Sequence, residues 1–266
     1  GIPLLLLPII WKFLPESIIF MVKADKQEQA RHVLTRLAPE ANVTATTPLE
    51  LSKAEVPESA TVANLFKKGR ATNTLLFWLA FFMCLLTMYA LGSWMPKLMM
   101  AAGYSMGSSL LFLLAMNIGA VIGTVSGGML ADRFHLKPVI MVLGVVGAIV
   151  LSLLGFEPPQ VALYLMIALA GAASIGSQIL LYSYVAQYYP VAVRSTGIGW
   201  ASAVGRSGAI IGPILIGMLL GMDLPHQYNF IAVGIPLLVV AIAVTLISKQ
   251  DQAEEVEVKT PVVARN

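Results

Sequence analysis

The stretch GWASAVGRSGAIIGPILIG, residues 199–217, decides the fold class of this chain. It lies within a segment from Ser195 to Met222 whose one charged residue is Arg206. A helix rises about 1.5 Å per residue, so about 20 mostly apolar residues cross a bilayer. The stretch therefore predicts a transmembrane helix with an arginine near its middle. Because a charge at that depth is costly, we expect Arg206 to have a partner and a function.

The same apolar pattern recurs along the 266-residue chain. Hydrophobic residues make up 58% of the sequence and charged residues 12%, whereas about a quarter of a soluble domain is charged. The composition therefore predicts an all-α membrane protein, in which a six-helix bundle follows the end of an earlier span. The expected spans lie at residues 1–14 (truncated), 73–95, 107–131, 138–155, 160–187, 196–222 and 227–248.

Charged residues gather between the spans and set the expected topology. Lysine and arginine concentrate in the 15–70 segment, the 132–137 loop, the 188–195 loop and the tail, and the positive-inside rule places these parts in the cytoplasm. Within the first segment, KQEQARHVLTRL at 26–37 predicts a short amphipathic surface helix. The expected organisation is a span end at 1–14, a cytoplasmic central loop at 15–70, a transmembrane bundle at 71–248 and a cytoplasmic tail at 249–266.

Several kinds of chemistry find no support in the sequence. Cys84 is the one cysteine and the three histidines are scattered, which excludes an intramolecular disulfide framework and gives no metal-site spacing. A Gly-rich phosphate loop followed by Lys-Ser/Thr is absent. We therefore expect no cofactor, no metal and no enzymatic activity. The net charge of +3 reflects residues beside spans and indicates no nucleic-acid partner.

Glycines recur every four residues inside the expected spans. Such spacing lets helix backbones approach closely in lipid, so helix packing is favoured over a ligand-binding role. The residues with this spacing are Gly119, Gly123 and Gly127, then Gly208 and Gly212, then Gly217 and Gly221.

Two motifs resemble those of a known transporter family. GGMLADRFHLKP at 127–138 resembles the loop signature of the major facilitator superfamily, Gly-x-Leu-Ala-Asp-Arg-x-Gly-Arg-Lys, with His135 and Leu136 in place of its Gly and Arg. YPVAVRSTGIGWASAVGRSGAIIGP at 189–213 closely resembles the eleventh span of the aromatic acid:proton symporter branch. The segments at 88–105 and 168–190 look like its seventh and tenth spans.

This resemblance implies the C-terminal half of a twelve-helix carrier, carrying spans seven to twelve. Because Gly1 opens inside an apolar run without a basic leader, the chain is expected to be a fragment. The implied function is proton-coupled import of 4-hydroxybenzoate, protocatechuate or benzoate by alternating access across a bacterial inner membrane. The implied partners are the substrate, protons, the bilayer and the N-terminal half. The alternatives are a facilitator for another organic acid, a sugar or a drug, and, from other classes, a channel or a membrane-embedded enzyme.

Arg206 admits two interpretations. Its planar guanidinium can form a two-pronged pair with a substrate carboxylate. Alternatively, it pairs structurally, with backbone carbonyls loosened by nearby Gly and Pro or with an acid in the other half. Every acid after residue 70 and before the tail, namely Asp132, Glu157 and Asp223, falls at a helix end. We therefore expect the proton-coupling carboxylate in the N-terminal half.

The remaining candidates fall into two groups. Polar and aromatic residues inside spans could line a site for a flat aromatic acid, although Trp94 could instead be an interface anchor. Charged residues at the cytoplasmic ends could form a latch between helices, although Arg194 could simply set topology and the 132–133 pair could be a solvated turn. The expected substrate-binding residues are Arg206, Tyr89, Trp94, Asn117, Gln178, Tyr182 and, less centrally, Tyr184. The expected gating residues are Asp132, Arg133, Arg194 and Gly128.

Overall fold

The computed structural model describes residues 21, 26, 28–30, 32–33, 61–67, 69–101, 103, 105–156, 158–222 and 224–248. The chain separates into two compact units, Gly1–Ser59 and Ala60–Asn266, and the helices discussed below all belong to the second. The expected span end at 1–14, most of the expected central loop and the tail at 249–266 lie outside the described residues. Of the expected surface helix, residues 28–30 and 32–33 are helical.

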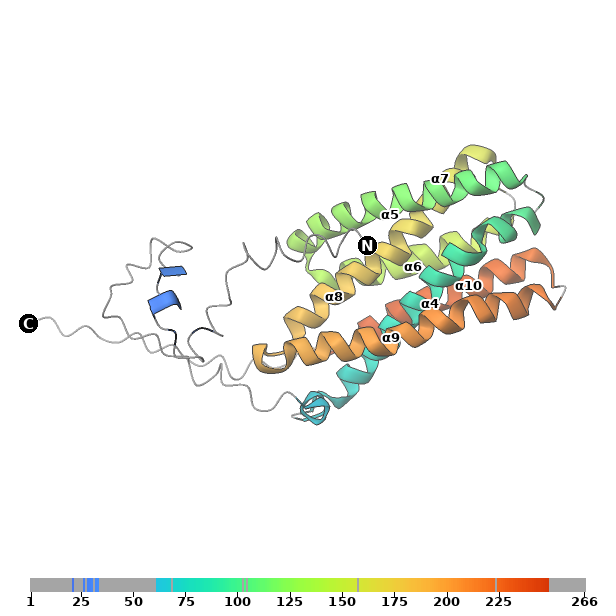
Figure 1. Ribbon diagram of the computed structural model, residues 1–266. Helices are drawn as coiled ribbons and strands as arrows, with labels where there is room; N and C mark the ends of the chain where they lie inside the picture. The colour runs from blue at the N-terminus through green and yellow to red at the C-terminus, as the bar shows by residue number, and fades with distance from the viewer. Residues whose placement is uncertain are drawn as a thin grey trace, which may run out of the picture. The chain divides into compact units, whose positions relative to one another are not determined.

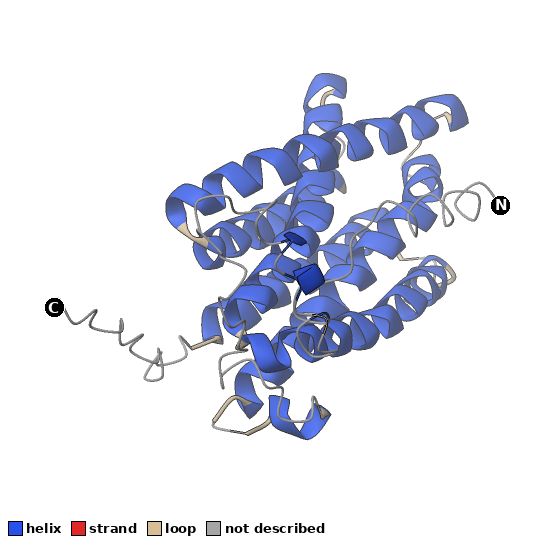
Figure 2. Ribbon diagram, turned by 60° about the vertical axis from the view of Figure 1, so that its left-hand side comes forward, coloured by secondary structure: helices blue, strands red, loops and turns tan. Residues whose placement is uncertain are grey.

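The second unit contains six helical spans long and apolar enough to cross a membrane among its described residues, so the predicted all-α fold is confirmed (Figures 1 and 2). One of them is continuous from Gln160 to Tyr188 but includes a π-helical turn, η4. The elements are η3 (Val62–Leu65), α4 (Ala71–Ala101), α5 (Met106–Phe134), α6 (Leu136–Leu154), α7 (Gln160–Gly171), η4 (Ala172–Gly176), α8 (Ser177–Tyr188), α9 (Val191–Leu220) and α10 (His226–Leu246).

Helix α4 runs further than the sequence suggested. It ends at Ala101 rather than at residue 95, although Pro96 lies inside it. The apolar residues Leu98 and Met99 beyond the proline are buried in the bundle. Their burial keeps the chain helical beyond residue 95, where the span was expected to end.

The spans pack most extensively as three pairs: α4 with α9, α5 with α7 and η4, and α6 with α10. Glycines make these contacts possible. A Cβ on Gly208 would strike the backbone of Phe82 in α4, and one on Gly123 would strike Ala172 in η4. The packing role predicted for the four-residue glycine repeats is thereby confirmed at these positions. At Gly221, in contrast, a Cβ would meet atoms of its own helix end.

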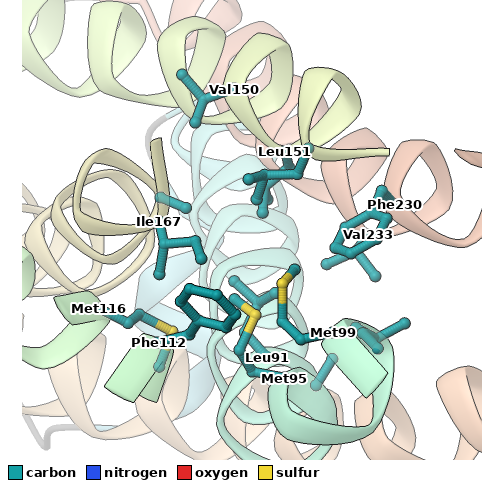
Figure 3. Packing of buried hydrophobic residues seen from close by; sticks show 14 of the residues in the cluster. Leu91, Met95, Met99, Phe112, Met116, Val150, Leu151, Ile167, Phe230 and Val233 are labelled. Carbon is teal, nitrogen blue, oxygen red and sulfur yellow. The ribbon is translucent and has the colours of Figure 1, made fainter. Parts of the chain in front are cut away.

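Large apolar side chains fill the space between the pairs in two clusters, one toward each end of the bundle. The cluster in Figure 3 brings methionines of α4 against an aromatic residue of α5 and aliphatic residues of three other helices. Unbranched methionine fills irregular gaps between helices well. The labelled members of this cluster are Leu91, Met95, Met99, Phe112, Met116, Val150, Leu151, Ile167, Phe230 and Val233.

A polar cluster links three spans at one end of the bundle, where α4 begins and α8 and α10 end. Asn73 Nδ2 in α4 donates to the Tyr188 hydroxyl in α8 (2.7 Å) and to the Ser248 carbonyl after α10 (3.1 Å), and Ser248 N donates back to Asn73 Oδ1 (3.2 Å). Beside it, Thr74 Oγ1 lies 2.8 Å from the Tyr189 hydroxyl. Burial raises the pKa of Tyr189, so this hydroxyl stays protonated at neutral pH.

We expect Asn73→Leu to lower the free energy of unfolding by about 1–3 kcal/mol, since three hydrogen bonds of about 1 kcal/mol each are lost, whereas the exposed Ser248 regains water as a partner. Thermal unfolding of the full-length parent in detergent measures this. The control is Asn117→Leu, because Asn117 Nδ2 bonds Leu113 O within its own helix. Equal shifts in melting temperature for the two variants would contradict the expectation that the hydrogen bonds of Asn73 between spans stabilise the bundle.

The turn between α5 and α6 holds a strained residue. His135 has φ 68° and ψ 158°, a region almost restricted to glycine, and among the described residues no other non-glycine has positive φ. The loop signature quoted above has glycine at this position. The backbone conformation at this position explains why the signature has glycine there. His135 adopts the same conformation at a cost in free energy.

We expect His135→Gly to raise the free energy of unfolding by about 1 kcal/mol. Relief of strain contributes about 1–3 kcal/mol, and the greater freedom of an unfolded glycine removes about 0.5–1 kcal/mol. Arg133→Gly, in the last turn of α5, is the control and should lower stability by about 1 kcal/mol. A loss of stability in both variants would show that His135 is not strained.

Candidate functional site

Arg206 lies near the middle of α9 and is exposed. It makes no hydrogen bond or ion pair with another described residue. The nearby glycines and Pro213 leave α9 helical. The interpretation that Arg206 pairs with backbone carbonyls loosened by these residues therefore finds no support within the described chain. A guanidinium in a membrane span that has no partner among the described residues suits an anionic ligand or an acid beyond those residues.

One turn before Arg206, α9 is joined to α8 by a hydroxyl pair. Ser202 Oγ lies 3.0 Å from the Tyr182 hydroxyl, and either oxygen can donate. The Tyr182 ring also packs edge-on against Phe81 of α4, with ring centroids 4.9 Å apart. Ser202 and Tyr182 are both half-buried, so this seam between α8 and α9 is partly accessible.

The directions of the helices place two further groups relative to this pair. Along α8, Tyr182 packs on Phe81 and Tyr184 packs on Phe77, so α8 runs opposite to α4. Along α9, Gly205 lies next to residues 81 and 85 of α4 and Gly217 next to residue 94, so α9 runs with α4. Helices α8 and α9 are therefore antiparallel.

Consequently Arg206 and Gln178 lie at a similar depth. Arg206 is one turn after Ser202 and Gln178 one turn before Tyr182, and residues four apart on a helix lie about 5–6 Å from each other on one face. Because the helices are antiparallel, both steps lead toward the same end of the bundle. Figure 1 shows α8 and α9 close together at one end and separating along their length.

Gln178 itself is buried, at 5% exposure, and neither atom of its amide has a hydrogen-bond partner among the described residues. The neighbouring Ser177 hydroxyl is likewise buried and unpaired. Both directly follow η4, a π-helical turn of a kind often found at functional sites. A buried amide without a partner lowers the free energy of unfolding by about 1–3 kcal/mol. The polar residues in this part of the span therefore do not serve stability.

The other expected substrate residues lie apart from Arg206. Tyr89 on α4 is 37% exposed, and Tyr184 packs against Phe77. Asn117 on α5 is exposed and donates within its own helix. Trp94 is half-buried against Gly217 and lies under the Lys97 ammonium, 4.4 Å from its ring centroid. Within the described chain, Tyr182 is the expected residue that makes a hydrogen bond to the turn of α9 before Arg206.

Among the described residues, the expected gating residues form no hydrogen bond or ion pair between their side chains. Asp132 and Arg133 are exposed at the end of α5, where the Arg133 guanidinium lies 5.4 Å from the Phe134 ring centroid. Arg194 Nε donates to Tyr189 O at 3.4 Å. No atom lies within 4 Å of a Cβ built on Gly128.

Lys137 matches the loop signature, but its hydrogen bonds are made to the end of α10 and not to the expected gating residues. Its ammonium Nζ donates to Thr245 O (2.9 Å) and Ile247 O (2.7 Å). A cation at a helix C-terminus satisfies orphan carbonyls and opposes the helix dipole. Lys137 therefore caps α10 and joins it to α6.

Sequence reasoning overlooked the roles of Ser202 and Asn73 as links between helices. A signal existed for Ser202, because it lies one turn before Arg206 on the same face of α9. For Asn73 no such signal existed, since its partners lie 115 and 175 residues away. Among the described residues, no group of three His, Cys, Asp or Glu could hold a metal.

Comparison with known proteins identifies the relatives of this chain. Residues 77–263 match the family model described as Major Facilitator Superfamily. The benzoate transport protein of Acinetobacter baylyi is 47% identical over 93% of this chain and 53% of its own length. The gentisate transporter of Corynebacterium glutamicum is 41% identical over 70% of this chain and 42% of its own length. The 4-hydroxybenzoate transporter PcaK of Pseudomonas aeruginosa is 31% identical over 92% and 55%.

A solved structure shows the same fold. It is that of FucP, a Major Facilitator Superfamily transporter in the outward conformation, with a TM-score of 0.64 and 14% identity over 84% of this chain and 55% of that chain. The chain thus spans about half the length of the curated relatives it matches. The matched family and the named relatives are transporters, not enzymes.

Proposed function

The chain belongs to the major facilitator superfamily, and from this premise we propose that it is the C-terminal six-helix half of a proton-linked importer of aromatic carboxylates. The substrates would be benzoate, 4-hydroxybenzoate, protocatechuate or a close analogue. Three relatives are named for transport of benzoate, gentisate and 4-hydroxybenzoate. Because this chain covers about half of each, the activity proposed is that of the complete protein.

The observation that carries this proposal is the unpaired Arg206 beside the hydroxyl pair of Ser202 and Tyr182. A guanidinium presents paired donors that match the two oxygens of a carboxylate. The neighbouring Tyr182 offers an aromatic face with a polar tip, which suits a flat aromatic acid. A sugar would need hydroxyl partners and no cation at this position.

The proposed partner within the complete carrier is the N-terminal half. Two spans of this chain are the least buried. The share of the span's apolar stretch that is buried within the bundle is 22% for α9 and 33% for α5, against 44–61% for the other four spans. Exposed aliphatic residues on α5 include Ile118, Val121 and Val125. We propose that the other half packs against α5 and α9, and that the substrate binds between the halves near the bilayer midplane.

Coupling and orientation complete the proposal. Asp132 lies in the last turn of α5, whereas Arg206 lies near the middle of α9, so the coupling carboxylate is proposed to lie in the N-terminal half. The chain is a multi-span membrane protein. We propose a bacterial inner membrane, with the 15–70 segment and the tail in the cytoplasm. Asp132, Arg133, Arg194 and Gly128 are proposed to act at the cytoplasmic gate.

Uptake into membrane vesicles that contain the full-length parent tests the proposed function. Labelled benzoate should accumulate when an inward proton gradient is imposed, and a protonophore should abolish the accumulation. Accumulation unaffected by the protonophore would refute proton coupling. Absence of benzoate accumulation, together with gradient-dependent accumulation of a labelled sugar or aliphatic acid, would favour the alternative of a facilitator for another substrate.

A further inference from the structure

From the sequence, Ser202 counts only as a small residue on the face of Arg206, yet its hydroxyl is half-buried and bonded across two spans, one turn from a cation that has no partner among the described residues. We infer that Ser202 and Tyr182 act as one hydroxyl pair that donates a second hydrogen bond to the carboxylate held by Arg206. This inference rests on the proposed function and deepens it, since it assigns the geometry of the carboxylate site.

Proton counting within the pair supports this assignment. Each hydroxyl carries one proton, and the 3.0 Å bond between Ser202 Oγ and the Tyr182 hydroxyl uses one of the two. The pair therefore retains a single proton that points elsewhere. No other hydrogen bond of either hydroxyl to a described residue is present, so this proton is available to a ligand.

The position of the pair matches the needs of a carboxylate on Arg206. Ser202 lies one turn from Arg206 on the same face of α9, about 5–6 Å away. A carboxylate that accepts two parallel bonds from a guanidinium keeps a further lone pair on each oxygen. A hydroxyl donor at the distance of one helical turn can reach that lone pair, so the anion would be held from two directions.

The surroundings make the seam polar on one side and aromatic on the other. The buried amide of Gln178, one turn from Tyr182, has no partner among the described residues and lies at the depth of Arg206. Phe81 of α4 fixes the Tyr182 ring by edge-on packing. The tyrosine hydroxyl is thereby held in place before substrate arrives, which reduces the entropy lost on binding.

A double-mutant cycle on benzoate uptake by the full-length parent tests the inference, with KM and maximal rate measured at matched expression. Ser202→Ala and Tyr182→Phe should each raise KM by about 10- to 100-fold, as expected for a lost hydrogen bond to a charged group. The double variant should be no worse than the worse single variant, because either substitution alone already breaks the hydroxyl pair that holds the donor in place. Ser202→Thr, which keeps the hydroxyl, should restore a KM near that of the wild type.

Ser207→Ala is the matched control, because Ser207 is also next to Arg206 but its hydroxyl donates to Val204 O at 2.6 Å. It should leave KM unchanged. A cycle in which the fold-changes multiply, or in which only the maximal rate falls, would overturn the inference while leaving the proposed function intact. Absence of benzoate uptake by the wild type would overturn both.

Discussion

Replacing Arg206 with lysine should raise the KM for benzoate by about 10- to 100-fold in the full-length parent. Lysine keeps the positive charge but presents a point charge instead of a planar fork, so the two-pronged bond to the carboxylate is lost. A hydrogen bond to a charged group contributes about 1.5–3 kcal/mol, and each 1.4 kcal/mol corresponds to about a factor of ten in affinity. Uptake of labelled benzoate over a range of concentrations measures the change.

Arg194→Lys is the control for this variant, since Arg194 is an exposed arginine of the same helix whose Nε donates to a backbone carbonyl. It should leave KM within a factor of about two, because Arg194 lies at the start of α9, away from the proposed carboxylate site, and its proposed role at the gate would change the maximal rate instead. An unchanged KM with a slower maximal rate in Arg206→Lys would contradict substrate binding. It would indicate instead that Arg206 pairs with an acid in the other half of the carrier.

Replacing Gly208 with alanine should prevent stable assembly of the bundle. An added Cβ would meet the carbonyl oxygen, carbonyl carbon and Cα of Phe82, and a backbone cannot rotate away as a side chain can. Overpacking costs about 1–3 kcal/mol where side chains can adjust, so we expect at least about 3 kcal/mol here. The expected result is a large fall in melting temperature and in the monodisperse yield after detergent extraction.

Gly199 in the same helix provides the comparison. A Cβ at Gly199 meets no atom within 4 Å, so Gly199→Ala should be neutral or slightly stabilising, because alanine favours helix. A similar loss of yield in both variants would show that glycine at these positions serves chain flexibility rather than the close packing of α4 against α9.

Much of the fold follows from local sequence. Apolar length predicts each span, and the four-residue spacing of Gly119 and Gly123 predicts a face that packs at backbone distance, which the contact with η4 confirms. The end of α4 was the exception, because the span was expected to end at residue 95, whereas the burial of Leu98 and Met99 beyond it is a tertiary effect. The strain at His135 was visible only as a departure from a familiar motif.

The candidate site was less accessible to sequence reasoning. Arg206 stands out because an intramembrane charge is costly, and no knowledge of its neighbours is needed. The partner of Tyr182, in contrast, depends on which residue of an antiparallel helix lies opposite, and spacing along one chain segment does not contain that information. Lys137 shows the same limit, because its motif suggested a loop charge whereas its ammonium caps α10.

The most direct measurement of the central claim is competition for labelled benzoate uptake by the full-length wild-type carrier, with benzoate and benzamide as competitors. The two share the ring and differ in the charge of one substituent. Recognition of a carboxylate by Arg206 predicts that benzamide competes about 10- to 100-fold more weakly than benzoate. Equal competition by the neutral amide would contradict the account, because the cation in α9 would then play no part in choosing the substrate.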